Sequence, residues 1–185
     1  MEVTTIVLAH SRITAQFAQS CLCESIRFAI RLVKQPTYMA NTSLTPEQLE
    51  KLIDLSFSAK TRAHAPYSKF RVGACLLTQS GEFITGCNVE NSSYGLSICA
   101  ERTALVKAVS EGHTNFRAIA VSSDLVDNHI SPCGACRQFI SEFGLMDIYL
   151  MKPDRTYIKT DTDALLPFRF TGEQLDGKKI QLEEQ

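Results

Sequence analysis

Cys99-Ala100-Glu101 is followed further along the chain by Pro132-Cys133-Gly134-Ala135-Cys136, and these two strings decide the fold and the chemistry. Three thiolates suit zinc, which is normally four-coordinate, and a site with three protein ligands leaves the fourth position to water. Glu101 is not needed as a ligand, so its carboxylate can move protons between that water and a substrate. The pattern therefore predicts a catalytic zinc site, with the three cysteines as ligands and the glutamate as proton carrier.

The pair Cys133-Gly134-Ala135-Cys136 alone fits two other kinds of site. In a reducing compartment this spacing is typical of a thioredoxin-like redox pair. It is also half of a structural zinc site, which Cys99 and either Cys87 or His129 could complete. Neither alternative has a use for Glu101, so the catalytic zinc site is favoured.

Length and composition indicate one globular domain. The chain has 185 residues, of which 44% are hydrophobic and 21% are charged. Its net charge is -1 and its lysines and arginines form no run longer than a pair, which argues against a nucleic-acid partner. Seven cysteines is an odd number, no secretory signal is visible, and no apolar window approaches the length of a membrane span. We therefore expect a cytoplasmic enzyme without disulfides and without a membrane partner.

Residues 1–44 differ in composition from the rest of the chain. They are basic, and residues 13–33 could form an amphipathic helix, as in a mitochondrial transit peptide. Glu2 and the late position of most arginines weaken that match. We expect 1–44 to be a disordered or loosely attached extension, dispensable for the fold, and 45–185 to be the catalytic domain.

The remaining sequence predicts alternating helices and strands. Thr45-Pro46-Glu47-Gln48 is a capping box that opens a helix running to about residue 63. Further helices are predicted over 99–110, 133–143 and 161–165, and strands over 72–78, 82–89, 117–123, 147–152 and 157–159. This order predicts an α/β fold with three layers, in which a mixed five-stranded sheet lies between helices.

Two features of this layout concern the cysteines. Both zinc-ligand segments lie where a loop meets a helix N-terminus, whose partial positive charge stabilises a thiolate by about 0.3–1 kcal/mol. Cys75 and Cys87 lie within predicted strands, so we expect them to be small buried hydrophobic residues rather than metal ligands.

From about Leu44 onward, the sequence resembles the small homotetrameric cytidine deaminases of the zinc-dependent, free-nucleoside type. The resemblance is carried by Ala65–Gly73 (APYSKFRVG), Gly86–Asn91 (GCNVEN), Cys99–Ala104 (CAERTA) and Ser131–Gln138 (SPCGACRQ). It implies a five-stranded sheet between helices, one zinc ion per subunit, and a tetramer whose subunits share residues between active sites. It also implies hydrolytic deamination of cytidine and deoxycytidine to uridine or deoxyuridine and ammonia, in pyrimidine salvage.

The resemblance also implies roles for individual residues. Asn88 and Glu90 match the pair that holds the ribose 3′-hydroxyl, and Phe70 matches an aromatic residue that packs on the pyrimidine. Phe170 corresponds to a C-terminal phenylalanine that reaches a neighbouring subunit's site, with Phe168 as a competitor for that position. Taken alone, the asparagine and the glutamate could serve turn formation, and Phe70 could belong to the core.

Charge balance adds one more candidate. Three thiolates on Zn²⁺ leave a net charge of -1, which opposes deprotonation of a bound water, so a nearby cation is needed. Arg102 or Arg137 could supply it by pairing with a ligand sulfur, and the resemblance favours Arg102. The carboxylate of Glu90 would repel phosphate, which favours a nucleoside substrate.

Two other functions remain open from the sequence. The same machinery could deaminate another aminopyrimidine nucleoside, such as a nucleoside antibiotic. The chain could also be a catalytically silent, zinc-stapled assembly module, although such a module has no need of Glu101.

Overall fold

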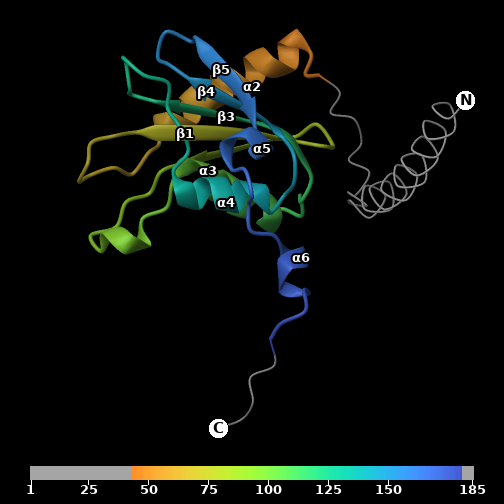
Figure 1. The fold of residues 1–185 in the computed structure, drawn as a ribbon. Helices are drawn as coiled ribbons and strands as arrows, with labels where there is room; N and C mark the ends of the chain where they lie inside the picture. The colour runs from red at the N-terminus through yellow and green to blue at the C-terminus, as the bar shows by residue number, and fades with distance from the viewer. Residues whose placement is uncertain (1–42, 181–185) are drawn as a thin grey trace, which may run out of the picture. The chain divides into compact units, whose positions relative to one another are not determined.

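A mixed five-stranded sheet lies at the centre of the computed structural model, which describes residues 43–180 (Figure 1). The strands lie in the order β2-β1-β3-β4-β5. Strand β1 pairs antiparallel with β2 and β3, β3 pairs parallel with β4, and β4 pairs antiparallel with β5. The strand bounds are β1 Val72–Thr78, β2 Phe83–Cys87, β3 Phe116–Ser123, β4 Asp147–Met151 and β5 Tyr157–Asp161.

Helices cover both faces of the sheet (Figure 1). Helix α2 packs Leu52 and Ile53 against one face, in a core that includes Leu77 and Met151. Helices α3 and α4 cover the other face, which holds the larger core around Leu105. The α/β fold with a five-stranded sheet between helices is confirmed. The helix bounds are α2 Pro46–Lys60, α3 Ala100–Ser110, α4 Gly134–Ser141, α5 Thr162–Leu165 and α6 Gly172–Leu175.

The first described helix begins where its capping box predicts. Thr45 Oγ1 accepts a hydrogen bond from the Gln48 amide at 3.2 Å, and Gln48 Oε1 accepts one from the Thr45 amide at 3.1 Å. The helix ends at Lys60 rather than near residue 63. Leu44, assigned to the extension from the sequence, packs against the core beneath α2. The other part of the predicted extension, residues 1–42, lies outside the described residues.

Two glycines allow helices to approach the sheet closely. A Cβ on Gly73 would lie 2.2 Å from the carbonyl oxygen of Ser56 in α2. A Cβ on Gly86 would lie 2.3 Å from the amide nitrogen of Ala104 in α3. Because these neighbours are backbone atoms, any side chain would push the helix away from its strand. The glycines therefore set the distance of α2 and α3 from the sheet.

The topology brings the candidate site residues to one end of strands β2, β1 and β3. Val72 at the start of β1 pairs with Ser123 at the end of β3, and Gly73 pairs with Cys87 at the end of β2. The loops after β2 and β3 then lead into the N-termini of α3 and α4. Phe70, Asn88 and both cysteine segments consequently meet at this end of the strands.

Some local structure was not expected from the sequence. Residues 90–98, between the predicted strand over 82–89 and the predicted helix over 99–110, contain a short 3-10 helix, η1 (Tyr94–Leu96), and α6 lies beyond the last predicted helix. Cys75 is fully buried, as expected, but Cys87 is only partly buried and its thiol donates to the carbonyl of Arg62 at 3.4 Å. None of the helices formed by residues 43–180 has the length and apolar character that crossing a bilayer requires.

Asp124 ties the end of β3 to two other elements. Its carboxylate accepts hydrogen bonds from Arg71 Nε at 2.9 Å and Nη2 at 3.2 Å, and pairs with Lys60 Nζ at 2.9 Å. Burial alone would raise the pKa of this carboxyl, but the two cations outweigh it and lower the pKa to about 2. The carboxylate thus anchors the start of the loop that leads to Cys133.

We predict that Asp124→Asn lowers the free energy of unfolding by about 1–3 kcal/mol at pH 7, because hydrogen bonds to a charged group are lost. The folded-state pKa lies below the ordinary value of 3.8, so this stabilisation is fully present above pH 3.8 and is lost as pH falls through 2. Urea unfolding of the unmodified protein and of Asp124→Asn between pH 7 and pH 3 should show that the difference between their free energies of unfolding narrows below about pH 4. Asp127→Asn, at an exposed position in the same loop, is the control, and an equal effect there would contradict the prediction.

Candidate metal centre

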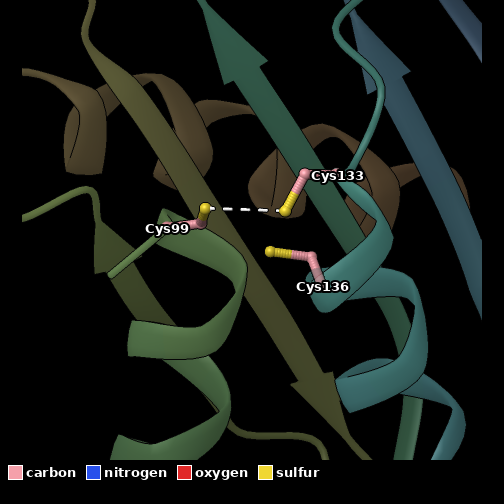
Figure 2. Close-up of side chains that lie close together, drawn as sticks. All are labelled: Cys99, Cys133 and Cys136. Atoms are coloured by element: carbon pink, nitrogen blue, oxygen red, sulfur yellow. Dashed lines mark hydrogen bonds between the residues drawn. The ribbon is translucent and has the colours of Figure 1, made fainter. Parts of the chain in front are cut away.

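Three cysteine sulfurs converge between the N-termini of α3 and α4 (Figure 2). Cys99 is the N-cap of α3, Cys133 is the N-cap of α4, and Cys136 lies in the first turn of α4. Their Sγ atoms all lie within 4.8 Å of one another, and those of Cys99 and Cys133 are 3.9 Å apart. The structure therefore brings together the three cysteines that the sequence singled out.

This spacing fits a tetrahedral zinc ion. With zinc–sulfur bonds of about 2.3 Å, tetrahedral ligands lie about 3.8 Å apart. Among residues 43–180, no further histidine, cysteine, aspartate or glutamate belongs to the same ligand group. Cys87 and His129, the two candidates for completing a structural site, are thus not part of it. The donor set matches a metal site with one position left for water.

Hydrogen bonding within the cluster favours a thiolate at Cys99. The hydrogen bond from Cys136 is the largest cause, burial opposes it, and a further hydrogen bond from Arg102 adds to it, so that the pKa of Cys99 falls to about 5. The same bond raises the pKa of Cys136, which keeps the shared proton. A metal ion in place of this proton would hold all the thiolates together.

Glu101 lies in the first turn of α3, directly beside the cysteines. Only 4% of its surface is exposed, which is unusual for a glutamate. Burial raises the pKa of its carboxyl, and the adjacent Cys99 charge acts in the same direction. The raised pKa favours the protonated form, so a proton that this carboxyl group accepts can be held and then returned.

The two candidate arginines make different contacts. Arg102 Nη2 lies 3.7 Å from Cys99 Sγ and 3.3 Å from the carbonyl oxygen of Ser97. Arg137 instead donates to the carbonyls of Pro132 and Leu165 and to the Ser131 hydroxyl. Arg102 is therefore the arginine that contacts a sulfur of the cysteine cluster, whereas Arg137 holds the loop before α4 through its hydrogen bonds.

Asn88 and Glu90 follow β2 and face the loop 64–70. Asn88 Oδ1 accepts from the Val72 amide at 2.8 Å, and Asn88 Nδ2 donates to the Phe70 carbonyl at 2.9 Å. Glu90 accepts hydrogen bonds from the amides of Tyr67 and Ser68 and from the Ser68 hydroxyl. The Ser68 hydroxyl is the main reason why the pKa of Glu90 is lowered. Both side chains thus hold this loop in place.

The three candidate aromatic residues differ in exposure. Phe70 is partly buried and packs against the core beneath α3 and α4. Phe170 is 55% exposed, and its carbonyl accepts a hydrogen bond from Gln138 of α4 at 2.8 Å. Phe168 is fully exposed and has a positive φ of 57°. Phe170 is therefore the one of the two C-terminal phenylalanines whose backbone is bonded to α4.

Two residues near the site were missed by reasoning from the sequence. Gly86 lets α3 approach the sheet, and Ser68 bonds Glu90. Gly86 lies in one of the strings that carry the resemblance, but its role depends on a helix that packs against it from elsewhere in the sequence. The Ser68 contact spans 22 residues, so no local pattern could have indicated it.

Comparison with known proteins agrees with this geometry. Residues 46–152 match the model of the cytidine and deoxycytidylate deaminase zinc-binding region. A probable cytidine deaminase from Dictyostelium discoideum is 54% identical over 142 residues, which cover 77% of this chain and 97% of that protein. A cytidine deaminase from Sporosarcina psychrophila is 49% identical over 69% of this chain and 94% of its own length. The crystal structure of cytidine deaminase from Burkholderia pseudomallei aligns with a TM-score of 0.64 and 43% identity, over 69% of this chain and all of that one.

We predict that Cys133→Ala loses most of its bound zinc, because it removes one of three sulfur ligands. Cys87→Ala is the matched control and should keep its full complement of zinc, since the Cys87 thiol bonds the Arg62 carbonyl instead. Metal analysis of the purified variants measures both. Equal zinc loss in the two proteins would make Cys87 a ligand and contradict the assignment.

Proposed function

This chain belongs to the cytidine and deoxycytidylate deaminase family, and from that premise we propose that it hydrolyses cytidine, and deoxycytidine, to uridine or deoxyuridine and ammonia. The observation that carries the proposal is a buried, non-ligand carboxyl group, Glu101, beside three converging cysteine sulfurs. A structural zinc site or a redox pair has no use for such a group. The reaction belongs to the salvage of pyrimidine nucleosides.

In the proposed mechanism, Cys99, Cys133 and Cys136 hold one zinc ion. When bound, the ion lowers the pKa of water and so supplies a nucleophile for C4 of the cytosine ring at neutral pH. Glu101 would accept one proton from that water and pass it to N3, then take the second proton from the hydroxyl group now on C4 and pass it to the amino group, which departs as ammonia. Its burial favours the protonated form, which is the form that donates.

Arg102 balances the charge of the thiolates in this proposal. Its contact with Cys99 Sγ places a permanent positive charge against the cluster, together with the N-termini of α3 and α4. The net charge at the metal is then less negative, which makes it easier for Glu101 to remove a proton from water.

The substrate pocket is formed at the end of the strands that lies next to the cysteines. Phe70 packs on the pyrimidine, and Asn88 and Glu90 bind the ribose 3′-hydroxyl. The carboxylate of Glu90 accepts three hydrogen bonds, which lowers its pKa and keeps it ionised at neutral pH. A charged carboxylate at the sugar disfavours phosphate, so the proposal is for a free nucleoside.

Assembly and location complete the proposal. The enzyme acts as a homotetramer in which Phe170 reaches the active site of a neighbouring subunit. A cytoplasmic location suits the five cysteines of residues 43–180, all of which are free thiols, because a reducing compartment preserves metal-binding thiolates.

The central test compares Glu101→Gln with Cys99→Ala. Glutamine has the size of glutamate but cannot accept a full proton, so Glu101→Gln should keep its zinc and lose at least about 10²–10⁴-fold in cytidine turnover. Cys99→Ala removes a ligand and should lose zinc and stability together. Bound metal, melting temperature and ammonia release from cytidine are measured for both variants and for the unmodified protein.

Three outcomes of this test would count against the proposal. A Glu101→Gln protein without zinc would show that the glutamate is a ligand. Normal turnover in that variant would assign the proton transfers to another residue. An unmodified, zinc-loaded protein that releases no ammonia from cytidine would contradict the proposed activity itself.

The assembly is tested with Phe170→Ala. Its side chain is half exposed on its own subunit, so removing it should raise KM for cytidine by about tenfold while zinc content stays unchanged. Phe168→Ala is the matched comparison and should have a smaller effect on KM. Light scattering that finds a fully active monomer would contradict the shared site, and a larger effect at Phe168 would transfer the role to that residue.

A further inference from the structure

Ser68 contacts both sides of the proposed pocket: Glu90 on the sugar side and Phe70 on the base side. Its hydroxyl donates to Glu90 Oε1 and accepts a hydrogen bond from the Phe70 amide at 3.0 Å. Its own amide donates to Glu90 Oε2 at 3.2 Å. One side chain therefore bonds both the carboxylate on the sugar side and the backbone of the aromatic residue on the base side.

These bonds determine which part of Glu90 stays available. A carboxylate has about four acceptor sites, two on each oxygen. Oε2 accepts from the amides of Tyr67, at 3.0 Å, and Ser68, and Oε1 accepts from the Ser68 hydroxyl. Counting the bonds made by residues 43–180, one acceptor site remains, and it is on Oε1.

The neighbouring Asn88 keeps a complementary group. One N–H of its amide bonds the Phe70 carbonyl and its oxygen bonds the Val72 amide. An amide nitrogen carries two donors, so within the described part of the chain one N–H of Asn88 remains. A sugar hydroxyl both donates and accepts, which matches one free acceptor on Glu90 and one free donor on Asn88.

We propose that Ser68 is a positioning residue that directs the free acceptor of Glu90 toward the sugar 3′-hydroxyl. This rests on the proposed function, because it places a nucleoside at this end of the strands. The hydroxyl acts as donor and acceptor at once, which alanine cannot do. Without it, the Oε1 atom gains a second open site and the carboxylate is held only by two backbone amides on its other oxygen.

The experiment measures kcat/KM for cytidine and for 3′-deoxycytidine, which lacks the hydroxyl at issue, on the same zinc-loaded preparation of each variant. The ratio of the two values is independent of how much of the sample is active. The unmodified protein should prefer cytidine, and Ser68→Ala should lower that preference by about tenfold, mainly through KM for cytidine. Ser68→Thr keeps a hydroxyl at an exposed position and should retain the preference within about twofold.

Ser68→Val completes the set, because valine has the shape of threonine without the hydroxyl. It should resemble Ser68→Ala, so the threonine–valine pair makes the same comparison if the alanine variant is poorly folded. A preference unchanged in Ser68→Ala and Ser68→Val overturns the proposal, as does an unmodified enzyme that treats both substrates alike. If circular dichroism shows that neither variant folds, the hydroxyl serves the fold and the positioning role is overturned. Failure of the unmodified protein to deaminate cytidine is a separate result, which contradicts the proposed function.

Discussion

The contact between α3 and β2 at Gly86 is the constraint on which the metal centre depends. A side chain there would meet the backbone of Ala104 and the carbonyl of Ala100, at 2.3 and 2.6 Å from its Cβ. Ala100 directly follows Cys99, so the depth of α3 on the sheet sets the position of one sulfur relative to the two carried by α4. The sulfur triangle, with no side longer than 4.8 Å, thus rests on a backbone contact made by the first turns of the helix that Cys99 caps.

Successive residues of α3 serve different sides of this centre. Adjacent helical positions point about 100° apart, which allows Glu101 to be buried beside the cysteines while Arg102 reaches Cys99 Sγ. The acidic group and the basic group are therefore kept from pairing with each other. One residue can exchange protons, and the next can hold a fixed charge against a thiolate.

Local signals explain what the sequence could predict. The capping box at Thr45 and the apolar patterns placed the main helices and strands to within a few residues, and the cysteine strings indicated the metal set. The contacts of Ser68 with Glu90, and of Asp124 with Lys60 and Arg71, join segments separated by 22 to 64 residues. Such contacts depend on strand order and register, which no local pattern contains. For the same reason, the sequence left open whether Arg102 or Arg137 meets a sulfur.

We expect the two faces of the sheet to differ in how they respond to loss of the metal. All three sulfurs belong to the layer formed by α3 and α4, whereas α2 packs a separate apolar core on the opposite face. Metal-binding free energy therefore acts directly on one cooperative unit and reaches the other only through the shared strands. We therefore expect removal of the metal to loosen the layer formed by α3 and α4 first, while α2 and the strands beneath it keep their protection from amide hydrogen exchange. The stability of the layer on one side of the sheet should thus depend on bound metal, whereas that of the layer on the other side should not.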